Sequence, residues 1–261
     1  MFCLKNFSLL TSCLIFFIIQ SSHGSEIIGG KEVKPHSLPF MALLESDRPI
    51  CGGILIDPAW VLTAAHCPNI RTVILGVHSI EKKKKKETHL RQVRKVQKCV
   101  RHPSFSKKNG VNDLMLLKLN EPVQETKTVK CLQLHKHVKD PAAGSKCLVA
   151  GWGKTEKNQT SDVLMSVKVT VINRQTCNSP DYYNHKPVIT SDMICAGSKG
   201  KKKTDTCKGD SGGPLLCNRV LVGVTSFGPE ECGNMKKPGV YSFLSEKQLK
   251  WIKDTMGTPE I

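Results

Sequence analysis

The serine in the stretch Gly209-Asp-Ser-Gly-Gly-Pro214 is the residue of this sequence best suited to do chemistry. Glycines on both sides of Ser211 predict a tight turn in which neighbouring backbone N–H groups point toward one place. Such a turn suits a nucleophile beside an oxyanion hole. A glycine-rich turn that contains a serine is also a common structural loop, so the interpretation depends on partner residues elsewhere in the chain.

A histidine and an aspartate supply those partners. His66 ends the stretch Val61-Leu-Thr-Ala-Ala-His66 and precedes Cys67, and Asp113 leads into the apolar run Leu114-Met-Leu-Leu117. An ionised side chain in such a run needs a partner. A lone histidine in this setting is commonly structural, and each signal is weak by itself. Together they offer a base, an orienting carboxylate and a nucleophile in the chain order His, Asp, Ser.

Short apolar runs separated by turns rich in Gly, Pro, Asn or Lys must position these residues. We expect strands over Pro39–Leu44, Gly53–Ile56, Arg71–Leu75, Leu114–Leu119, Cys147–Ala150, Val167–Ile172 and Val220–Val224. This pattern predicts an all-β barrel or sandwich and does not choose between the two.

One helix is expected near the end of the chain. Ser245-Glu-Lys-Gln248 has the sequence of a capping box, and Leu249, Ile252 and Met256 recur at helical spacing. Gly257 can end this helix.

Composition and charge narrow the class of protein. The 261 residues include 39 Lys and Arg against 22 Asp and Glu, a net charge of +17, and 39% are hydrophobic. These values are typical of a globular protein and exclude a disordered chain, a collagen-like fibre and a multi-span membrane protein. The 12 cysteines indicate an oxidising compartment.

The first 24 residues have the layout of a secretory signal peptide. Lys5 precedes the apolar run Leu14–Ile19, and small residues at Ser21–Gly24 offer a cleavage site. A membrane anchor is the alternative, but the apolar stretch 9–19 is shorter than the roughly 20 residues that cross a bilayer. We therefore expect a secreted protein without a membrane span, whose mature chain starts after residue 24.

Six motifs in sequence order resemble those of the chymotrypsin-like serine proteases. They are Ile27-Ile-Gly-Gly30, Leu62-Thr-Ala-Ala-His-Cys67, Asn112-Asp-Leu114, Gly151-Trp-Gly153, Gly209-Asp-Ser-Gly-Gly-Pro214 and Pro238-Gly-Val-Tyr241. The resemblance implies an all-β protease domain over residues 27–261, built of two antiparallel six-stranded β-barrels and a C-terminal helix. The barrels would span residues 27 to about 140 and about 141 to 256, with the active site between them.

The resemblance also implies a mechanism. Ser211 would attack the scissile carbonyl, His66 would carry the proton, and Asp113 would orient the imidazole. The backbone N–H groups of Gly209 and Ser211 would form the oxyanion hole.

Substrate specificity follows from the same comparison. Asp205 lies six residues before Ser211, where the family has the floor of its S1 pocket, and Ser226, Gly228 and Gly239 correspond to the walls. A carboxylate at this floor predicts cleavage after Arg or Lys. The alternative is a surface aspartate on a lysine-rich loop.

The family pattern further implies an inactive precursor. Cleavage before Ile27 would free an α-ammonium group that pairs with Asp210. With the signal peptide removed, the propeptide is the dipeptide Ser25-Glu26, and such an acidic-ended dipeptide is similar to that of the granzymes.

Within the family, Pro187-Val-Ile189 and Thr225-Ser-Phe-Gly228 are most similar to the granzyme A group, with the granzyme K group next. Phe227 stands where many relatives have Trp. This similarity implies a protease of cytolytic granules. The alternatives are another secreted tryptic protease, of mast-cell or venom type, and a non-catalytic heparin-binding homologue.

The resemblance implies the four disulfides Cys51–Cys67, Cys147–Cys217, Cys177–Cys195 and Cys207–Cys232, whereas counting alone allows many pairings. Cys99 and Cys131 are left over. A disulfide-linked homodimer through Cys99 is our hypothesis, and a buried free thiol or an internal Cys99–Cys131 bond are the alternatives.

The remaining expectations concern partners. The charge of +17 attracts polyanions, so the segments Lys82–Lys86 and Lys199–Lys203 are either sites for heparin or a sulfated proteoglycan, or solvated loops. No motif indicates sequence-specific nucleic-acid binding.

Asn158-Gln-Thr160 is a glycosylation sequon. The family implies protein substrates and serine protease inhibitors as partners, and we expect no cofactor and no metal.

Overall fold

A computed structural model describes residues 27–81, 85–156, 158–200 and 203–257. The expected signal peptide at residues 1–24 and the dipeptide Ser25-Glu26 lie outside the described residues. So do residues 82–84 and 201–202, which belong to the two lysine-rich segments.

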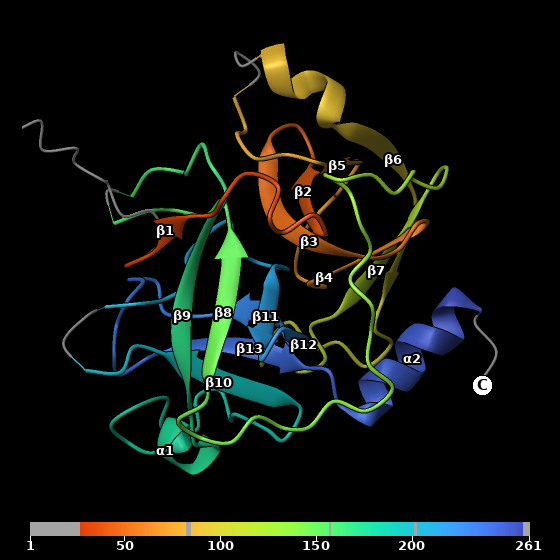
Figure 1. The fold of residues 1–261 in the computed structure, drawn as a ribbon. Coiled ribbons are helices and arrows are strands. Elements are labelled where there is room, and N and C mark those ends of the chain that lie inside the picture. The colour runs from red at the N-terminus through yellow and green to blue at the C-terminus, as the bar shows by residue number, and fades with distance from the viewer. Residues whose placement is uncertain (1–26, 82–84, 157, 201–202, 258–261) are drawn as a thin grey trace, which may run out of the picture.

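The first barrel is closed by six antiparallel strands in the order β2-β3-β4-β7-β6-β5. The strands are β2 (Met41–Glu45), β3 (Pro49–Asp57), β4 (Trp60–Thr63), β5 (Thr72–Leu75), β6 (Gln92–Arg101) and β7 (Met115–Leu119). Figure 1 shows them in orange to yellow-green in the upper part of the molecule. Their inward-facing side chains, among them Leu44, Leu55, Val61, Leu75 and Leu117, form a separate buried cluster.

The second barrel follows the order β9-β10-β13-β12-β11-β8, and pairing of β8 with β9 closes it. Its strands are β8 (Lys146–Gly151), β9 (Met165–Ile172), β10 (Met193–Gly197), β11 (Pro214–Cys217), β12 (Val220–Phe227) and β13 (Gly239–Phe243). The expected all-β fold of two six-stranded antiparallel barrels is thus confirmed. Each of the strands expected from the apolar runs lies within or overlaps an observed strand.

The two ends of the described chain cross the expected boundary near residue 140. Strand β1 (Lys31–Glu32) pairs with β9 of the second barrel, with Lys31 opposite Ser166. Helix α2 (Glu246–Met256) returns to the first half of the chain, as Figure 1 shows in blue. There Gln248 Nε2 donates a 2.7 Å hydrogen bond to Asn112 Oδ1, directly before Asp113.

The expected capping box at the start of α2 is wrong. Ser245 occupies the N-cap position but makes no side-chain capping bond, and its Oγ donates instead to Asp192 Oδ1 at 3.1 Å. The Ser245 hydroxyl thus acts as a donor to a carboxylate and not as the acceptor for a helix N–H group. Gly257 ends the helix as expected, with a φ of 71°.

Two short helical segments, which the sequence did not predict, connect the strands. They are α1 (Arg174–Asn178) between β9 and β10 and a 3₁₀ helix, η1 (Lys85–Leu90), before β6. Asn173 caps α1, because its side chain accepts a hydrogen bond from the Gln175 amide.

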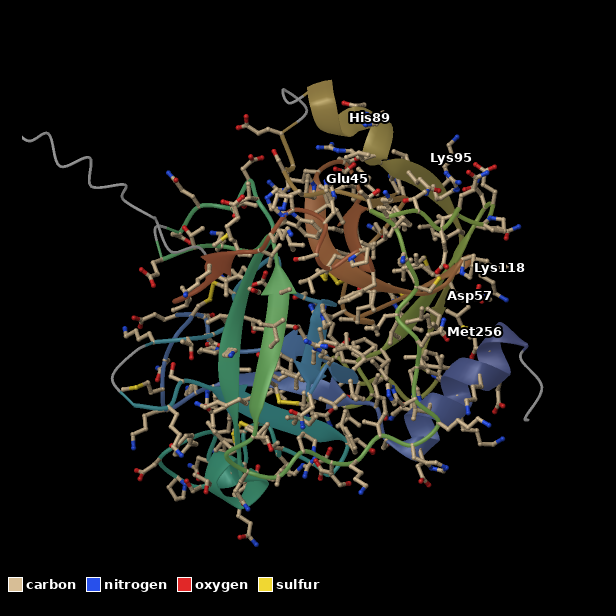
Figure 2. All side chains as sticks on the ribbon, in the orientation of Figure 1. Glu45, Asp57, His89, Lys95, Lys118 and Met256 are labelled. Atoms are coloured by element: carbon tan, nitrogen blue, oxygen red, sulfur yellow. A yellow bond between two sulfur atoms is a disulfide. The ribbon has the colours of Figure 1, made fainter. Side chains whose placement is uncertain are left out.

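Figure 2 shows the charged side chains of Lys95 and Lys118 projecting outward from β6 and β7. Among the described residues, no helix is both long and apolar enough to cross a bilayer.

The hydrogen bond between Gln248 and Asn112 links α2 to the residue that directly precedes Asp113. Replacing Gln248 with Ala leaves a buried amide oxygen of Asn112 without its donor, and we expect the free energy of unfolding to fall by about 1–3 kcal/mol. Urea unfolding with the disulfides intact measures this loss. The exposed neighbour Lys247→Ala serves as the control, and equal stability of the two variants would contradict the assignment.

Candidate active site

A cleft of about 470 Å³ brings together residues that are distant in the sequence. His66, which follows β4, and Asp113, which precedes β7, line it from the first half of the chain. Ser211 lines it from the turn before β11. The base, the carboxylate and the nucleophile expected from the sequence are therefore neighbours in space.

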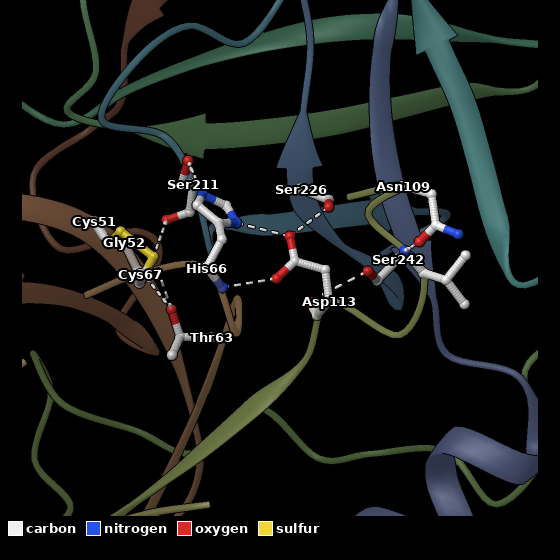
Figure 3. A network of polar contacts seen from close by, with 11 residues as sticks. Cys51, Gly52, Thr63, His66, Cys67, Asn109, Asp113, Ser211, Ser226 and Ser242 are labelled. Carbon is white, nitrogen blue, oxygen red and sulfur yellow. Dashed lines mark hydrogen bonds and ion pairs between the residues drawn. A yellow bond between two sulfur atoms is a disulfide. The ribbon is translucent and has the colours of Figure 1, made fainter. Parts of the chain in front are cut away.

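Their side chains form one hydrogen-bonded row (Figure 3). His66 Nδ1 lies 2.7 Å from Asp113 Oδ2, and His66 Nε2 lies 2.9 Å from Ser211 Oγ. An ionised carboxylate only accepts hydrogen bonds, so Nδ1 carries the proton of the neutral ring. Nε2 is then the acceptor, and the Ser211 hydroxyl donates to it. The row can therefore draw a proton from Ser211.

Asp113 is nearly inaccessible, with its side chain 3% exposed against 31% for His66. Besides the imidazole, its carboxylate accepts hydrogen bonds from the His66 backbone N–H at 2.9 Å and from the Ser226 hydroxyl. The Ser242 hydroxyl donates to the Asp113 carbonyl at 3.2 Å. This set of donors lets a carboxylate stay charged while buried and fixes the position of both its oxygens.

Ser226 thus has a contact that sequence reasoning missed. We expected it at the wall of the S1 pocket, and it does line the cleft, but its hydroxyl also binds Asp113. The available signal was a serine near the end of the mostly apolar strand β12. Such a residue, when buried, must find a partner.

The turn that carries Ser211 is held by the first barrel. The Gly52 amide in β3 donates to the Ser211 carbonyl at 2.8 Å, and the Thr63 hydroxyl donates to the Gly52 carbonyl at 2.8 Å. Gly212 has a φ of 81°, and a Cβ there would lie only 2.1 Å from Thr63 Oγ1. Only glycine fits this close approach, which explains the glycine that follows the serine.

Asp205 is 1% exposed and directly precedes Thr206 and Cys207, which line the cleft. Its carboxylate accepts hydrogen bonds from the amides of Thr206 at 2.9 Å and Gly233 at 3.0 Å. A Cβ built on Gly239 would lie 3.0 Å from Asp205 Oδ1, and one on Gly228 would lie 3.8 Å from the Gly239 Cα. The two glycines therefore leave a narrow slot above the carboxylate, and the alternative of a surface aspartate does not hold.

Burial raises the pKa of Asp205 to about 7, because the charged form loses its water, although the amides of Gly233 and Thr206 oppose the shift. No ion pair among the described residues includes Asp205. A positively charged group in the slot would favour its ionised form.

Comparison with known proteins agrees with this geometry. The family model described as Trypsin matches residues 27–252. The chain belongs to the trypsin family of serine proteases. Bovine (Bos taurus) granzyme A is 47% identical over 234 residues, which cover 88% of each chain. Human (Homo sapiens) kallikrein-4 is 39% identical over 91% of this chain and 90% of its own.

Among solved structures, neuropsin, a serine protease expressed in the limbic system of mouse brain, is similar with a TM-score of 0.76. It is 36% identical, and the match covers 87% of this chain and 98% of the neuropsin chain. The resemblance to chymotrypsin-like proteases and to granzyme A is confirmed. A family of this kind acts on protein substrates.

The start of this trypsin-family domain is packed into the second barrel. Ile27 is fully buried, and Ile28 forms a bridge with Asp205, whose amide donates to the Ile28 carbonyl at 3.2 Å. Asp210 is also fully buried, and its carboxylate accepts hydrogen bonds from Gly153 N at 2.8 Å and Cys207 N at 2.9 Å. Burial raises the pKa of Asp210 to about 7.

The cysteines pair as the family pattern implied, in Cys51–Cys67, Cys147–Cys217, Cys177–Cys195 and Cys207–Cys232. The first bond adjoins His66, and the last borders the cleft. Cys99 is an exposed free thiol and Cys131 a partly buried one, so the alternative of an internal Cys99–Cys131 bond is wrong. Burial raises the pKa of the Cys131 thiol to about 12, and nearby protein atoms that partly desolvate the Cys99 sulfur raise its pKa as well.

The glycosylation sequon lies on the surface. Asn158 is exposed, and its Oδ1 accepts a 2.9 Å hydrogen bond from Lys154 Nζ. Within the described ranges, no group of three or more His, Cys, Asp or Glu side chains is arranged to hold a metal ion.

The raised pKa of Asp205 predicts a pH-dependent stability. Between its unfolded pKa of about 3.9 and its folded pKa of about 7, the folded state binds a proton that the unfolded state does not. The contribution of Asp205 to stability therefore falls as pH rises through this window. Asp205→Asn lacks this loss, so its stability relative to wild type should rise by about 2–4 kcal/mol from pH 4 to pH 8.

Urea unfolding at several pH values measures this change. The exposed carboxylate Asp181 gives the matched control, Asp181→Asn, for which we expect no comparable trend. A constant stability difference between Asp205→Asn and wild type over this pH range would contradict the burial argument.

Proposed function

We propose that this trypsin-family chain is a serine endopeptidase that cleaves after Arg or Lys, with Ser211, His66 and Asp113 as its catalytic residues. The observation that carries the proposal is the row of contacts from Asp113 Oδ2 through His66 to Ser211 Oγ, at 2.7 and 2.9 Å. It lies in a cleft that is also lined by Thr206, whose amide donates to the buried carboxylate of Asp205.

The contacts suggest a two-stage reaction. Ser211 Oγ bonds to the scissile carbonyl carbon while its proton passes to His66 Nε2, and the carbonyl electrons move to oxygen. The C–N bond then breaks, and His66 returns the proton to the leaving amine. A water molecule repeats the sequence on the acyl-enzyme and regenerates Ser211. Asp113 stabilises the imidazolium that forms in each stage.

The amides of Gly209 and Ser211 are proposed to stabilise the negative oxygen. Gly209 has a φ of 102°, which glycine adopts without strain, and a Cβ there would meet Gly153 Cα at 3.0 Å. This backbone shape is compatible with both amides facing one point. Loss of a single such donor in related sites raises the barrier by about 3–4 kcal/mol.

Electrostatics support the choice of Arg and Lys. The Asp205 carboxylate is buried and has a pKa of about 7 without a cation. A guanidinium or ammonium group in the slot would offset the cost of ionisation, whereas an uncharged side chain would leave the carboxylate unpaired. The slot therefore discriminates by charge.

Activation is proposed to require cleavage before Ile27. The buried Asp210 carboxylate has two amide partners, and no ion pair among the described residues includes it. A new α-ammonium group at Ile27 would supply the missing charge. Because Ile28 is paired with the Asp205 segment, docking of the new terminus would also stabilise the S1 pocket.

The similarity to granzyme A favours a secreted protease stored in cytolytic granules, and the similarity to kallikrein-4 keeps another secreted tryptic protease as the second candidate. The exposed Cys99 thiol could link two copies, which a non-reducing gel would reveal as a dimer band. Serine protease inhibitors and a sulfated polyanion such as heparin are the other proposed partners, the latter because of the net charge of +17.

Hydrolysis of reporter peptides that end in Arg, Lys, Phe, Asp or Ala tests the proposed activity, with protein cut before Ile27. We expect hydrolysis after Arg and Lys only, and none with Ser211→Ala. Asp205→Ser should lower kcat/KM for Arg peptides by about 30- to 5,000-fold, because a buried charge pair loses one partner.

Uncut protein provides the control for activation and should be much less active. Comparable hydrolysis after Phe or Asp would contradict the assignment of Asp205. Absence of hydrolysis with every peptide, in a folded and correctly cut sample, would favour the non-catalytic heparin-binding homologue.

A further inference from the structure

We infer that the cleft selects substrates with an acidic residue close to the cleaved Arg or Lys, through Lys107 and Lys108. This inference rests on the proposed function and adds a second determinant of specificity to Asp205. Both lysines line the same cleft as His66 and Ser211. Sequence analysis did not single them out, because two adjacent lysines resemble any solvated loop.

A tight hairpin holds the two lysines. Ser106 and Val111 form an antiparallel bridge, with the Ser106 amide donating to the Val111 carbonyl at 3.0 Å. The Gly110 amide donates to the Ser106 carbonyl at 2.9 Å, and the Val111 amide donates to Asn109 Oδ1 at 3.3 Å. Lys107 and Lys108 therefore sit on a backbone that is internally hydrogen-bonded.

This hairpin is anchored to the site on both sides. Gly110 has a φ of 69°, and a Cβ there would lie 2.5 Å from Phe227 Cε1, so the hairpin contacts the ring of β12 directly. On the other side, Asn112 Nδ2 donates to the Ser104 carbonyl at 3.0 Å, and Asp113 follows at once. The backbone that carries the two lysines is thus tied to the row formed by Asp113, His66 and Ser211.

The charges along the cleft are unevenly distributed. The carboxylates that line it are Asp113, which is already bound by His66 and Ser226, and Glu230. Glu230 and Lys208 line both this cleft and a neighbouring hollow of about 640 Å³, where cations and carboxylates balance.

At the end of the cleft formed by the hairpin, the two lysines are not balanced by carboxylates of the described chain. None of the ion pairs formed by the described residues includes Lys107 or Lys108, and both side chains are exposed. An acidic side chain of a bound peptide would meet two ammonium groups at the edge of a cleft, where the field of like charges raises the local concentration of the opposite charge. The preferred substrate is therefore bipolar, with a cation for Asp205 and a nearby carboxylate for the hairpin.

A peptide set with Arg at the cleaved position tests this inference. Glu or its neutral counterpart Gln is placed in turn at each neighbouring position on both sides of the cleaved bond. With wild-type protein cut before Ile27, we expect at least one position where Glu raises kcat/KM about two- to fivefold over Gln at low salt. This gain should shrink in about 0.5 M NaCl, because salt screens the pair.

The decisive comparison uses Lys107→Gln/Lys108→Gln, in which the ratio of Glu to Gln substrates should fall to about one. Lys127→Gln/Lys168→Gln removes the same charge from exposed positions outside the cleft and should keep the wild-type ratio. The ratio separates charge recognition from any general effect on turnover.

Three results would overturn the inference while leaving the proposed function intact. They are cleavage of the Arg peptides without a preference for Glu at any position, a preference that survives in Lys107→Gln/Lys108→Gln, and a preference lost equally in the control pair. Failure to cleave every peptide would instead overturn the proposed function, and the inference with it.

Discussion

The burial of one carboxylate, that of Asp113, is the constraint on which the site depends. A buried charge of this kind is tolerated only when donors surround it. Here the donors come from His66 after β4 and from Ser226 in β12, while Ser242 in β13 binds the adjacent carbonyl. Because these residues belong to different barrels, satisfying Asp113 fixes the barrels relative to each other and opens the cleft at the same place.

The second barrel carries two more buried carboxylates whose charge is not matched in this way. The pKa values of Asp205 and Asp210 are both raised to about 7 by burial, and both groups are held by backbone amides. Each would gain from a cation that arrives from outside the packed core, a substrate side chain for Asp205 and a new chain terminus for Asp210. In the proposed function, substrate recognition and activation would both rest on this one electrostatic principle.

Much of this arrangement could be predicted from the sequence, because motif spacing and alternating apolar residues are local signals. They led to seven strands, the last helix and the three residues of the catalytic row. Strand β6 was missed because none of its side chains is fully buried and charged residues interrupt its apolar ones, so it lacks a continuous apolar face. The contact of Ser226 with Asp113 joins residues that lie 113 positions apart in the sequence. The placement of Lys107 beside the cleft likewise depends on tertiary packing. No local sequence pattern encodes either.

The most direct test of the central claim is covalent labelling by a fluorophosphonate, which reacts with an activated serine hydroxyl. Protein cut before Ile27 should take up one label, located at Ser211 by peptide mass analysis. The labelling rate should drop by several orders of magnitude in Asp113→Asn, because the imidazole then loses the partner that fixes its proton on Nδ1. Labelling at wild-type rate in Asp113→Asn, or label on other residues at a rate equal to that of Ser211, would contradict the account.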